Sequence, residues 1–491
     1  MNSIFNRSNP AIEKVFAEAG KPEKVMCVPI DYAKKTHTAL VCNGAGMQLR
    51  SAFNVHNTPE GIAFLGDIVA GLCRKHHIRP KSVIYGGEDG PSFSFNFIHA
   101  LAAQDGVVVG FNAHDAKAER AHWPASTDKL DLLGIASLII KKQGRTITTE
   151  HSTAAVLRRL TRYREALVDS RTATALRMHH LVDQLLPGFL DAKRSGVDPF
   201  SRASLWLMRE RFSPAQIKAR RRAALIAKLE EFAVQDPAGS AQQVKHLAQS
   251  VLPAPAALSS TLQLCLHNEV THYESLNGCL HPLEIDIARR LAATPGAVLT
   301  SVPGIGLTLA AGLYAELADP PRQRALYRLS SYAGIVARLK QSGGPDKEAK
   351  PIGRAQRGNR FLKNLIVTTA LQIGRYGHPE LRADYSRREV AGQTVRLTMA
   401  RRILRIVCHL MNNTDFFRPP SLLAADTPHE ALRQYYQDAW MPMLVKWRNA
   451  GAIQQAFAPD APLEQWRTML NELYELNLSK LSPQAAQLRR G

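Results

Sequence analysis

The pattern of apolar and polar residues changes once in a clear way, near residue 148. Before that point, short apolar runs bounded by turn residues are typical of strands, and two stretches with helical spacing lie between them. Strands and helices in this order predict a mixed sheet with helices packed on it. The expected strands cover 25–33, 37–43, 49–55, 81–89 and 106–112, the expected helices 58–78, 92–105 and 127–142, and a loop 113–126.

After residue 148 the apolar spacing is helical and the polar positions are basic as far as about residue 293. A helix is expected over 213–232, because Ser213 can cap it and Pro214 fits its first turn. Long helices with few glycines indicate a coiled-coil-like arm that pairs with another copy or holds RNA. A packed helical insert is the alternative. The run Arg220–Arg222 can contact phosphates or simply form a solvated face.

The stretch from Leu299 to Leu365 combines two apolar helices with a glycine-rich connection, Pro303–Gly306. Such a connection can present backbone N–H groups to a phosphate. Ser342 follows in a turn with two glycines, and basic residues then lead into a third helix. The alternative is an ordinary helical domain with turns and a solvated basic face. The residues expected to bind nucleic acid are Gly304, Gly306, Arg354, Arg357, Asn359, Arg360 and Lys363.

Composition and charge narrow the possible partners. A chain of 491 residues is too long for one core and predicts several domains. The net charge of +21 favours a polyanion partner, most commonly nucleic acid. No apolar run is long enough to span a bilayer, and the start of the chain lacks the pattern of a secretory signal, so no membrane association is expected.

The six cysteines are scattered and form no CxxC pair, which is typical of reduced thiols in a cytoplasmic protein. One cluster of potential ligands lies on an expected long helix, but its spacing matches no common zinc pattern. A zinc site is therefore not the favoured interpretation. The cluster consists of Cys265, His267, His272, Cys279 and His281.

Acidic residues recur where the predicted strands end. Asp31 closes the first strand and Glu88 the fourth, while Asp128 and Asp131 lie three residues apart on one face of the following helix. Four converging carboxylates repel one another unless divalent cations neutralise them. Two Mg²⁺ ions about 4 Å apart are the usual arrangement for phosphodiester chemistry. Taken singly, each acid can also be a surface charge or a helix cap.

These features together resemble an RNase H-like, RuvC-type nuclease domain. The string Thr127 to Asp131, combined with the stretch 299–365, is similar to the IS-one-ten and IS-eleven-eleven family of DEDD transposases. The resemblance covers about 25–145 and 294–400. It is carried by Ile30 to His37, by Glu88 with Gly90 and Phe93, by Pro303 to Gly306, by Gly334-Ile335, by Ser342-Gly343 and by Arg357-Gly358-Asn359.

The resemblance implies a DNA recombinase in which Asp31, Glu88, Asp128 and Asp131 hold Mg²⁺ and Ser342 is the nucleophile. It also implies donor and target DNA as substrates, a noncoding bridge RNA as guide, and a homo-dimer or tetramer. Two alternatives are a Holliday-junction nuclease that needs the four acids but not Ser342, and a non-enzymatic nucleic-acid-binding protein whose acids are structural.

The expected architecture is an α/β RNase H-like domain, a mostly α-helical insert and a helical transposase domain. The expected parts are a flexible N-terminus (1–23), the RuvC-like domain (24–147), the helical region (148–293), the serine-bearing domain with a helix-hairpin-helix-like Pro-Gly-Ile-Gly (294–400) and a helical C-terminal extension (401–491).

Overall fold

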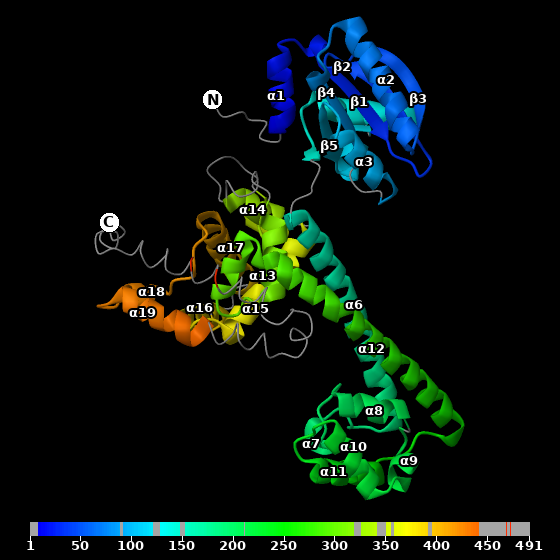
Figure 1. The fold of residues 1–491 in the computed structure, drawn as a ribbon, viewed down its shortest axis with the longest axis vertical. Coiled ribbons are helices and arrows are strands. Elements are labelled where there is room, and N and C mark those ends of the chain that lie inside the picture. Colours follow the sequence, from blue (N-terminus) through cyan, green and yellow to red (C-terminus); the bar gives the residue numbers. More distant parts are fainter. Residues whose placement is uncertain are drawn as a thin grey trace. The chain divides into compact units, whose positions relative to one another are not determined.

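The chain divides into two compact units, Met1–His151 (unit 1) and Ser152–Gly491 (unit 2). Unit 1 holds a mixed sheet (Figure 1), whereas the described residues of unit 2 form helices and a β-hairpin. A computed structural model describes residues 8–88, 92–120, 128–147, 153–210, 212–318, 326–340, 350–354, 358–390 and 395–440, with Thr468 and Glu472.

The sheet of unit 1 has six strands in the order β3-β2-β1-β4-β5-β6. The first three strands form an antiparallel meander, β4 and β5 continue the sheet parallel to β1, and β6 returns antiparallel to β5. The five predicted strands are confirmed, and β6 was not predicted. The strands are β1 (Met26–Asp31), β2 (Thr36–Asn43), β3 (Gln48–His56), β4 (Val83–Glu88), β5 (Val107–Phe111) and β6 (Arg145–Ile147).

Helices cover both faces of this sheet, as the alternation of apolar residues requires. One face packs against α2 (Pro59–His76) and α3 (Phe95–Ala102), with Leu65, Val69 and Phe97 in the core. The other face packs against α5 (Asp128–Ile140) and α1 (Pro10–Ala19). Successive residues of β1 alternate between the two cores: Met26, Val28 and Ile30 enter the first, and Cys27 enters the second.

Two segments of unit 1 differ from the predictions. Residues 10–19, expected within a flexible N-terminus, form α1, because Asn9 caps the helix and Ile12 and Val15 are buried against the sheet. The expected loop 113–126 contains α4 (Ala113–Arg120), where Ala116 joins the same core. In both cases the sequence is polar, and a few small or apolar side chains suffice to anchor the helix.

Two long antiparallel helices form the backbone of unit 2. Helix α6 (Thr153–Leu185) pairs with α12 (Ala256–Ala292) along much of its length, through contacts such as Arg164 with Glu284 and Arg177 with Glu269 (Figure 1). The helical prediction for this region is confirmed. No helix in the described part of the chain is long and apolar enough to cross a membrane.

A small helical bundle connects α6 to α12 and has its own core, in which Leu186, Phe189, Phe212 and Leu229 are buried. The helix predicted over 213–232 is interrupted at Arg220, whose backbone is extended and whose guanidinium lies 4.8 Å from the Trp206 ring. The bundle consists of α7 (Ala192–Ser195), α8 (Arg202–Glu210), α9 (Pro214–Ala219), α10 (Arg222–Glu231) and α11 (Pro237–Ser250).

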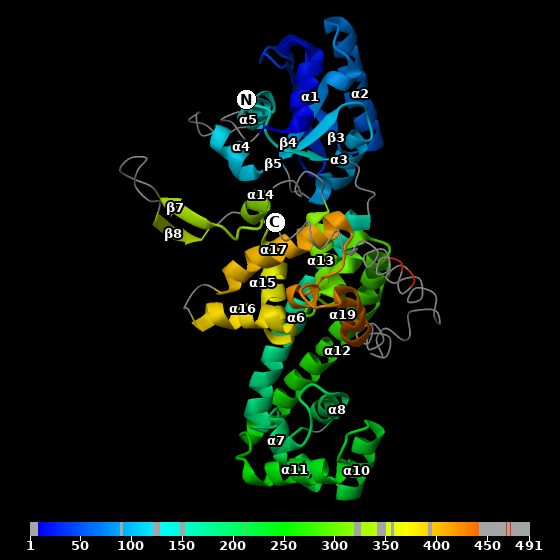
Figure 2. The same ribbon diagram turned by 90° about the vertical axis from the view of Figure 1, so that its left-hand side faces the viewer.

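A second core in unit 2 surrounds α13 (Leu307–Leu317), which packs on α6, α12 and α15 (Figure 2). The helix predicted at these residues is confirmed. The other members of this core region are the 3₁₀ helix η4 (Pro295–Ser301), α14 (Leu326–Tyr332), α15 (Arg360–Tyr376), α16 (Pro379–Val390), α17 (Val395–Asn413), α18 (Pro420–Leu423) and α19 (Pro428–Tyr435), and the hairpin strands are β7 (Ala337–Lys340) and β8 (Lys350–Arg354).

Candidate active site

Asp31 and Glu88 are the last residues of two neighbouring strands, and both lie at the carboxyl ends of these strands. Strands β1 and β4 are parallel, and their register pairs Ile30 with Gly87. Asp31 and Glu88 are the next residues along each strand, and adjacent strands lie about 4.8 Å apart. Both side chains are partly exposed. The sheet therefore brings together two of the four carboxylates that the sequence analysis singles out.

Both carboxylates belong to the face of the sheet that α5 covers. Side chains on a strand alternate between faces, so Asp31 shares the face of Cys27, and Glu88 shares the face of Ile84. Cys27 and Ile84 pack in the core with α5. Gly86 allows the close approach of this helix, because a Cβ there would lie 2.8 Å from the Ile139 side chain.

The other two acids lie at the start of α5, since Asp128 is its first residue and Asp131 lies one turn later. Asp131 is partly exposed, and the side chain of Asp128 lies outside the described part of the structure. Among the described residues, no group of three or more His, Cys, Asp or Glu could hold a metal ion. The pair Asp31 and Glu88 supplies the hard oxygen ligands that a divalent cation requires.

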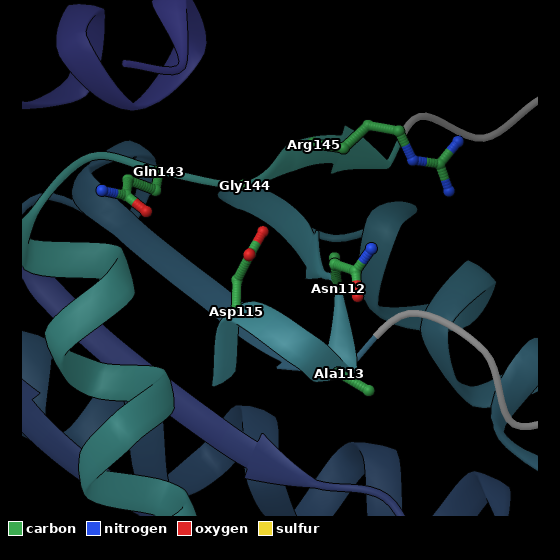
Figure 3. Close-up of a pocket in the computed structure, with 7 residues that line it drawn as sticks. Asn112, Ala113, Asp115, Gln143, Gly144 and Arg145 are labelled. Carbon is green, nitrogen blue, oxygen red and sulfur yellow. The ribbon is translucent and has the colours of Figure 1, made fainter. Parts of the chain in front are cut away.

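A pocket of about 480 Å³ opens at the end of β5, the strand that pairs with β4. The register pairs Glu88 with Phe111, and the lining residues Gly110 and Asn112 lie on either side of Phe111 in the chain. In Figure 3 the Asp115 carboxylate and the Asn112 amide line this space, while the Arg145 side chain extends away from Asp115. The end of β5 is thus open and polar, although neither Asp31 nor Glu88 lines this pocket.

The sequence analysis names His37 as the end of the stretch Ile30 to His37 but gives it no role; it lies at the start of β2. Its ring is buried, accepts a hydrogen bond from the Ala33 N–H at 3.1 Å, and has an Nε2 atom without a hydrogen-bond partner among the described residues. Desolvation lowers the pKa of His37, despite hydrogen bonds that act in the opposite direction. The ring contacts Tyr32 and Phe97 at centroid distances of 5.5 and 4.2 Å. A histidine inside a strand-like apolar pattern was the available signal.

Ser342 lies outside the described residues, in the connection between β7 and β8. These strands pair antiparallel from Ala337 with Arg354 to Lys340 with Lys350. The connection that contains the serine therefore starts and ends at a paired position.

The two glycines of Pro303–Gly306 have different surroundings. Gly304 has φ +95°, and a Cβ there would lie 3.1 Å from the backbone of Gln372 and Ile373 in α15. Gly306 precedes α13 as its N-cap, and a Cβ there would meet no atom of the described residues within 4 Å, its chain neighbours aside. Gly304 thus permits close helix packing, while Gly306 leaves the start of α13 open.

Two of the expected basic residues, Arg360 and Lys363, lie in the first turn of α15. Arg360 is exposed, with its guanidinium 5.0 Å from the Phe361 ring, and Lys363 is partly exposed. Arg357 and the side chain of Arg354 lie outside the described part. Asn359 caps α15 and bonds to Glu316, a partner that the sequence analysis missed although a lone acid in the apolar α13 was a signal.

The Cys and His residues from Cys265 to His281 all lie on α12. Cys265 and Cys279 are exposed. The His267 ring is 3.2 Å from the carbonyl oxygen of Arg209, and the His272 ring is 3.4 Å from the Thr174 hydroxyl. These histidines are thus in contact with the neighbouring helices α8 and α6.

Two protein families and one curated protein are similar to this chain in sequence. Residues 28–187 match the IS110-type DEDD transposase family, described as transposase. Residues 296–386 match the family described as transposase of the IS116/IS110/IS902 family. The chain is also 25% identical over 301 residues to the insertion element IS110 uncharacterized 43.6 kDa protein of Streptomyces coelicolor. The aligned region covers 60% of this chain and 72% of that protein. The two family matches together cover just over half of the sequence, and the chain belongs to the IS110 family of transposases.

Proposed function

We propose that this transposase cleaves and rejoins DNA strands with a divalent-metal carboxylate site and a serine nucleophile. The observation that carries the proposal is the register of β1 and β4, which places Asp31 and Glu88 side by side on the face covered by α5. Asp128 and Asp131 would complete the ligand set from the start of α5. The meander continued by parallel strands supports an RNase H-like, RuvC-type fold for unit 1.

Divalent cations bound at these carboxylates, most simply Mg²⁺, would activate the attacking hydroxyl and stabilise charge on the phosphate. The Ser342 hydroxyl oxygen forms a new bond to phosphorus, and the bond from phosphorus to one deoxyribose oxygen breaks. The serine proton ends on the released deoxyribose hydroxyl. Gly343 and Gly344 next to the serine allow a phosphate to approach closely. Reversal of the step with a different strand rejoins the DNA.

Arg354, Arg357, Arg360 and Lys363 would hold the DNA backbone near the serine, and Gly306 would offer the open start of α13 to a phosphate. The carboxylates lie on unit 1 and the serine on unit 2, so the proposed reaction needs both units. Strand exchange between two duplexes implies a dimer or a tetramer.

The test of the carboxylate site uses a supercoiled plasmid that carries the gene with its flanking DNA. Asp128→Asn removes the charge of a proposed ligand and should reduce Mg²⁺-dependent strand cleavage by roughly 100-fold or more. Asp67→Asn is the control, because Asp67 is exposed on α2, on the opposite face of the sheet. Wild-type cleavage by folded Asp128→Asn protein would contradict the assignment.

We also propose that a noncoding bridge RNA guides the enzyme by pairing with donor and target DNA. The net charge of +21 and the basic helices of unit 2 support an RNA partner. Protein purified at low salt should carry RNA, and its affinity for a structured RNA transcribed from the flanking DNA should fall steeply as salt increases. A preparation free of nucleic acid that does not bind this RNA would contradict the proposal.

A further inference from the structure

Glu316 is a buried carboxylate in the last turn of the apolar helix α13, with a relative exposure of 1%. Arg162 of α6 binds it with two bonds, from Nε to Oε1 at 2.7 Å and from the terminal nitrogen to Oε2 at 3.0 Å. Burial alone would lower the pKa of Arg162, but the hydrogen bond and charge of Glu316 outweigh it and raise this pKa. A buried charge of this kind persists only when it is paired and hydrogen-bonded.

Asn359 uses the full hydrogen-bonding capacity of its side chain inside the protein. Its Nδ2 donates to Glu316 Oε2 at 2.5 Å and to the Tyr332 hydroxyl at 2.7 Å. Its Oδ1 accepts from the N–H groups of Phe361 and Leu362 at 3.0 and 3.2 Å. An amide offers two donors and two acceptor sites. No bond is left for a phosphate, so Asn359 is better suited to hold protein elements together.

The same residues join the two ends of the β7–β8 hairpin. The chain enters β7 from Tyr332 and Gly334 and returns from β8 to Gly358 and Asn359. The Asn359 N–H donates to the Tyr332 carbonyl at 2.6 Å. Gly358 has φ +150°, and a Cβ there would lie 2.7 Å from the backbone of Gly334. The backbone before β7 and after β8 is therefore in direct contact at one place.

We propose that Arg162, Glu316, Tyr332 and Asn359 form a hairpin clamp that positions the serine-bearing hairpin relative to α6 and α13. This inference rests on the proposed role of Ser342. The clamp residues are positioning residues: they fix the two ends of the hairpin, where the chain enters β7 and leaves β8. Asn359 acts through Glu316 and Tyr332 and does not contact the nucleic acid.

The contact between Glu316 and Asn359 can be tested by exchanging its two groups. Asn359→Asp keeps the helix cap but places a second carboxylate beside Glu316. Glu316→Gln removes the charge that Arg162 binds. The double variant restores a carboxylate–amide contact with the donor and acceptor reversed. Glu269→Gln is the matched control, because Glu269 forms a similar two-bond pair with Arg177 of α6, at 2.8 and 2.9 Å, away from the hairpin.

Two readouts are compared with the wild type: hydrogen exchange of the β7 and β8 amides, and cleavage of the supercoiled plasmid that carries the gene with its flanking DNA. Each single variant should exchange these amides about 10-fold faster and cleave about 10-fold more slowly, with unchanged affinity for the plasmid. The double variant should recover both to within about threefold of the wild type. Glu269→Gln should match the wild type in both.

Unchanged hairpin exchange in folded single variants would overturn the clamp, as would a double variant that shows no recovery. A loss of plasmid affinity in Asn359→Asp that the double variant does not restore would instead show a direct nucleic-acid contact. If the single variants do not fold, recovery of folded protein by the double variant supports the clamp and its failure overturns it. Ser342→Ala is measured in parallel, because its cleavage reports on the proposed function, whereas hydrogen exchange reports on the clamp alone.

Discussion

The carboxylates of the two units have different surroundings. Glu316 in unit 2 is buried with an arginine of the same chain at 2.7 Å and an amide at 2.5 Å. Asp31 and Glu88 in unit 1 are instead neighbours of like charge, which the register of two parallel strands holds side by side at a partly exposed sheet edge. Like charges at such a distance disfavour each other's ionised form unless a cation is shared. Glu316 thus carries its counterion within the fold, whereas the proposed catalytic carboxylates lie where they could share a divalent cation.

The largest effect is expected where the internal counterion is removed. Arg162→Met leaves the Glu316 charge buried without its cation, and should lower the free energy of unfolding of unit 2 by roughly 3 kcal/mol. Arg177→Met removes the matching partner of Glu269, where the Arg177 side chain is exposed, and should lower the free energy of unfolding much less. Chemical denaturation measures both variants. Equal decreases in the free energy of unfolding of the two variants would contradict the comparison, because burial of the carboxylate would then have no effect on the value of the ion pair.

Divalent ions should stabilise unit 1 through its carboxylate pair, whereas Glu316 should not contribute to such a stabilisation. With MgCl₂ at about ten times the dissociation constant, wild-type unit 1 should gain about 1.4 kcal/mol of stability, and Glu88→Gln should gain much less. Asp67→Asn, on the opposite face of the sheet, should keep the full gain. Thermal unfolding with and without MgCl₂ in the full-length protein provides the measurement. A Mg²⁺ response retained in Glu88→Gln would contradict the shared-cation interpretation.

His37 adds to this comparison a buried titratable group whose neutral form is favoured by burial. Its pKa is lowered in the folded protein, so the unfolded chain binds more protons below about pH 6.5. The stabilising contribution is therefore present above about pH 6.5 and is lost as the pH falls from that value through the lower pKa of the folded protein, by at most about 1.4 kcal/mol per pH unit.

In a pH series of unfolding measurements, His37→Phe should lose this component of the pH dependence. The exposed His56 on β3 provides the control, and His56→Gln should keep the component. An unchanged slope between pH 5 and 6.5 in His37→Phe would show that another group is responsible.

The sequence predicts best where local pattern and structure coincide. The strands that end in Asp31 and Glu88 and the helix Leu307–Leu317 follow from apolar runs and turn residues. Pairing along the sheet then brings the two acids together without further information. The acids of α5 depend on how a helix crosses the sheet, which strand periodicity does not determine.

The hairpin clamp could not be predicted in the same way. Arg162 and Glu316 are 154 residues apart, and Asn359 lies in a basic motif that indicates phosphate binding when read locally. Only the contacts of Asn359 with Glu316 and Tyr332 show that its amide bonds are used within the protein. Helices α1 and α4 were missed for a related reason, because their few apolar side chains become significant only against the sheet.

The covalent intermediate tests the central claim most directly. Wild-type protein is incubated in Mg²⁺ with end-labelled DNA from the flanking region of the gene, and a denaturing gel then separates free DNA from DNA attached to protein. The wild type should give a labelled protein–DNA adduct, and Ser342→Ala should give none while binding the DNA normally. An adduct or recombinant product formed by Ser342→Ala would exclude this serine as the nucleophile and leave the chemistry to the carboxylates.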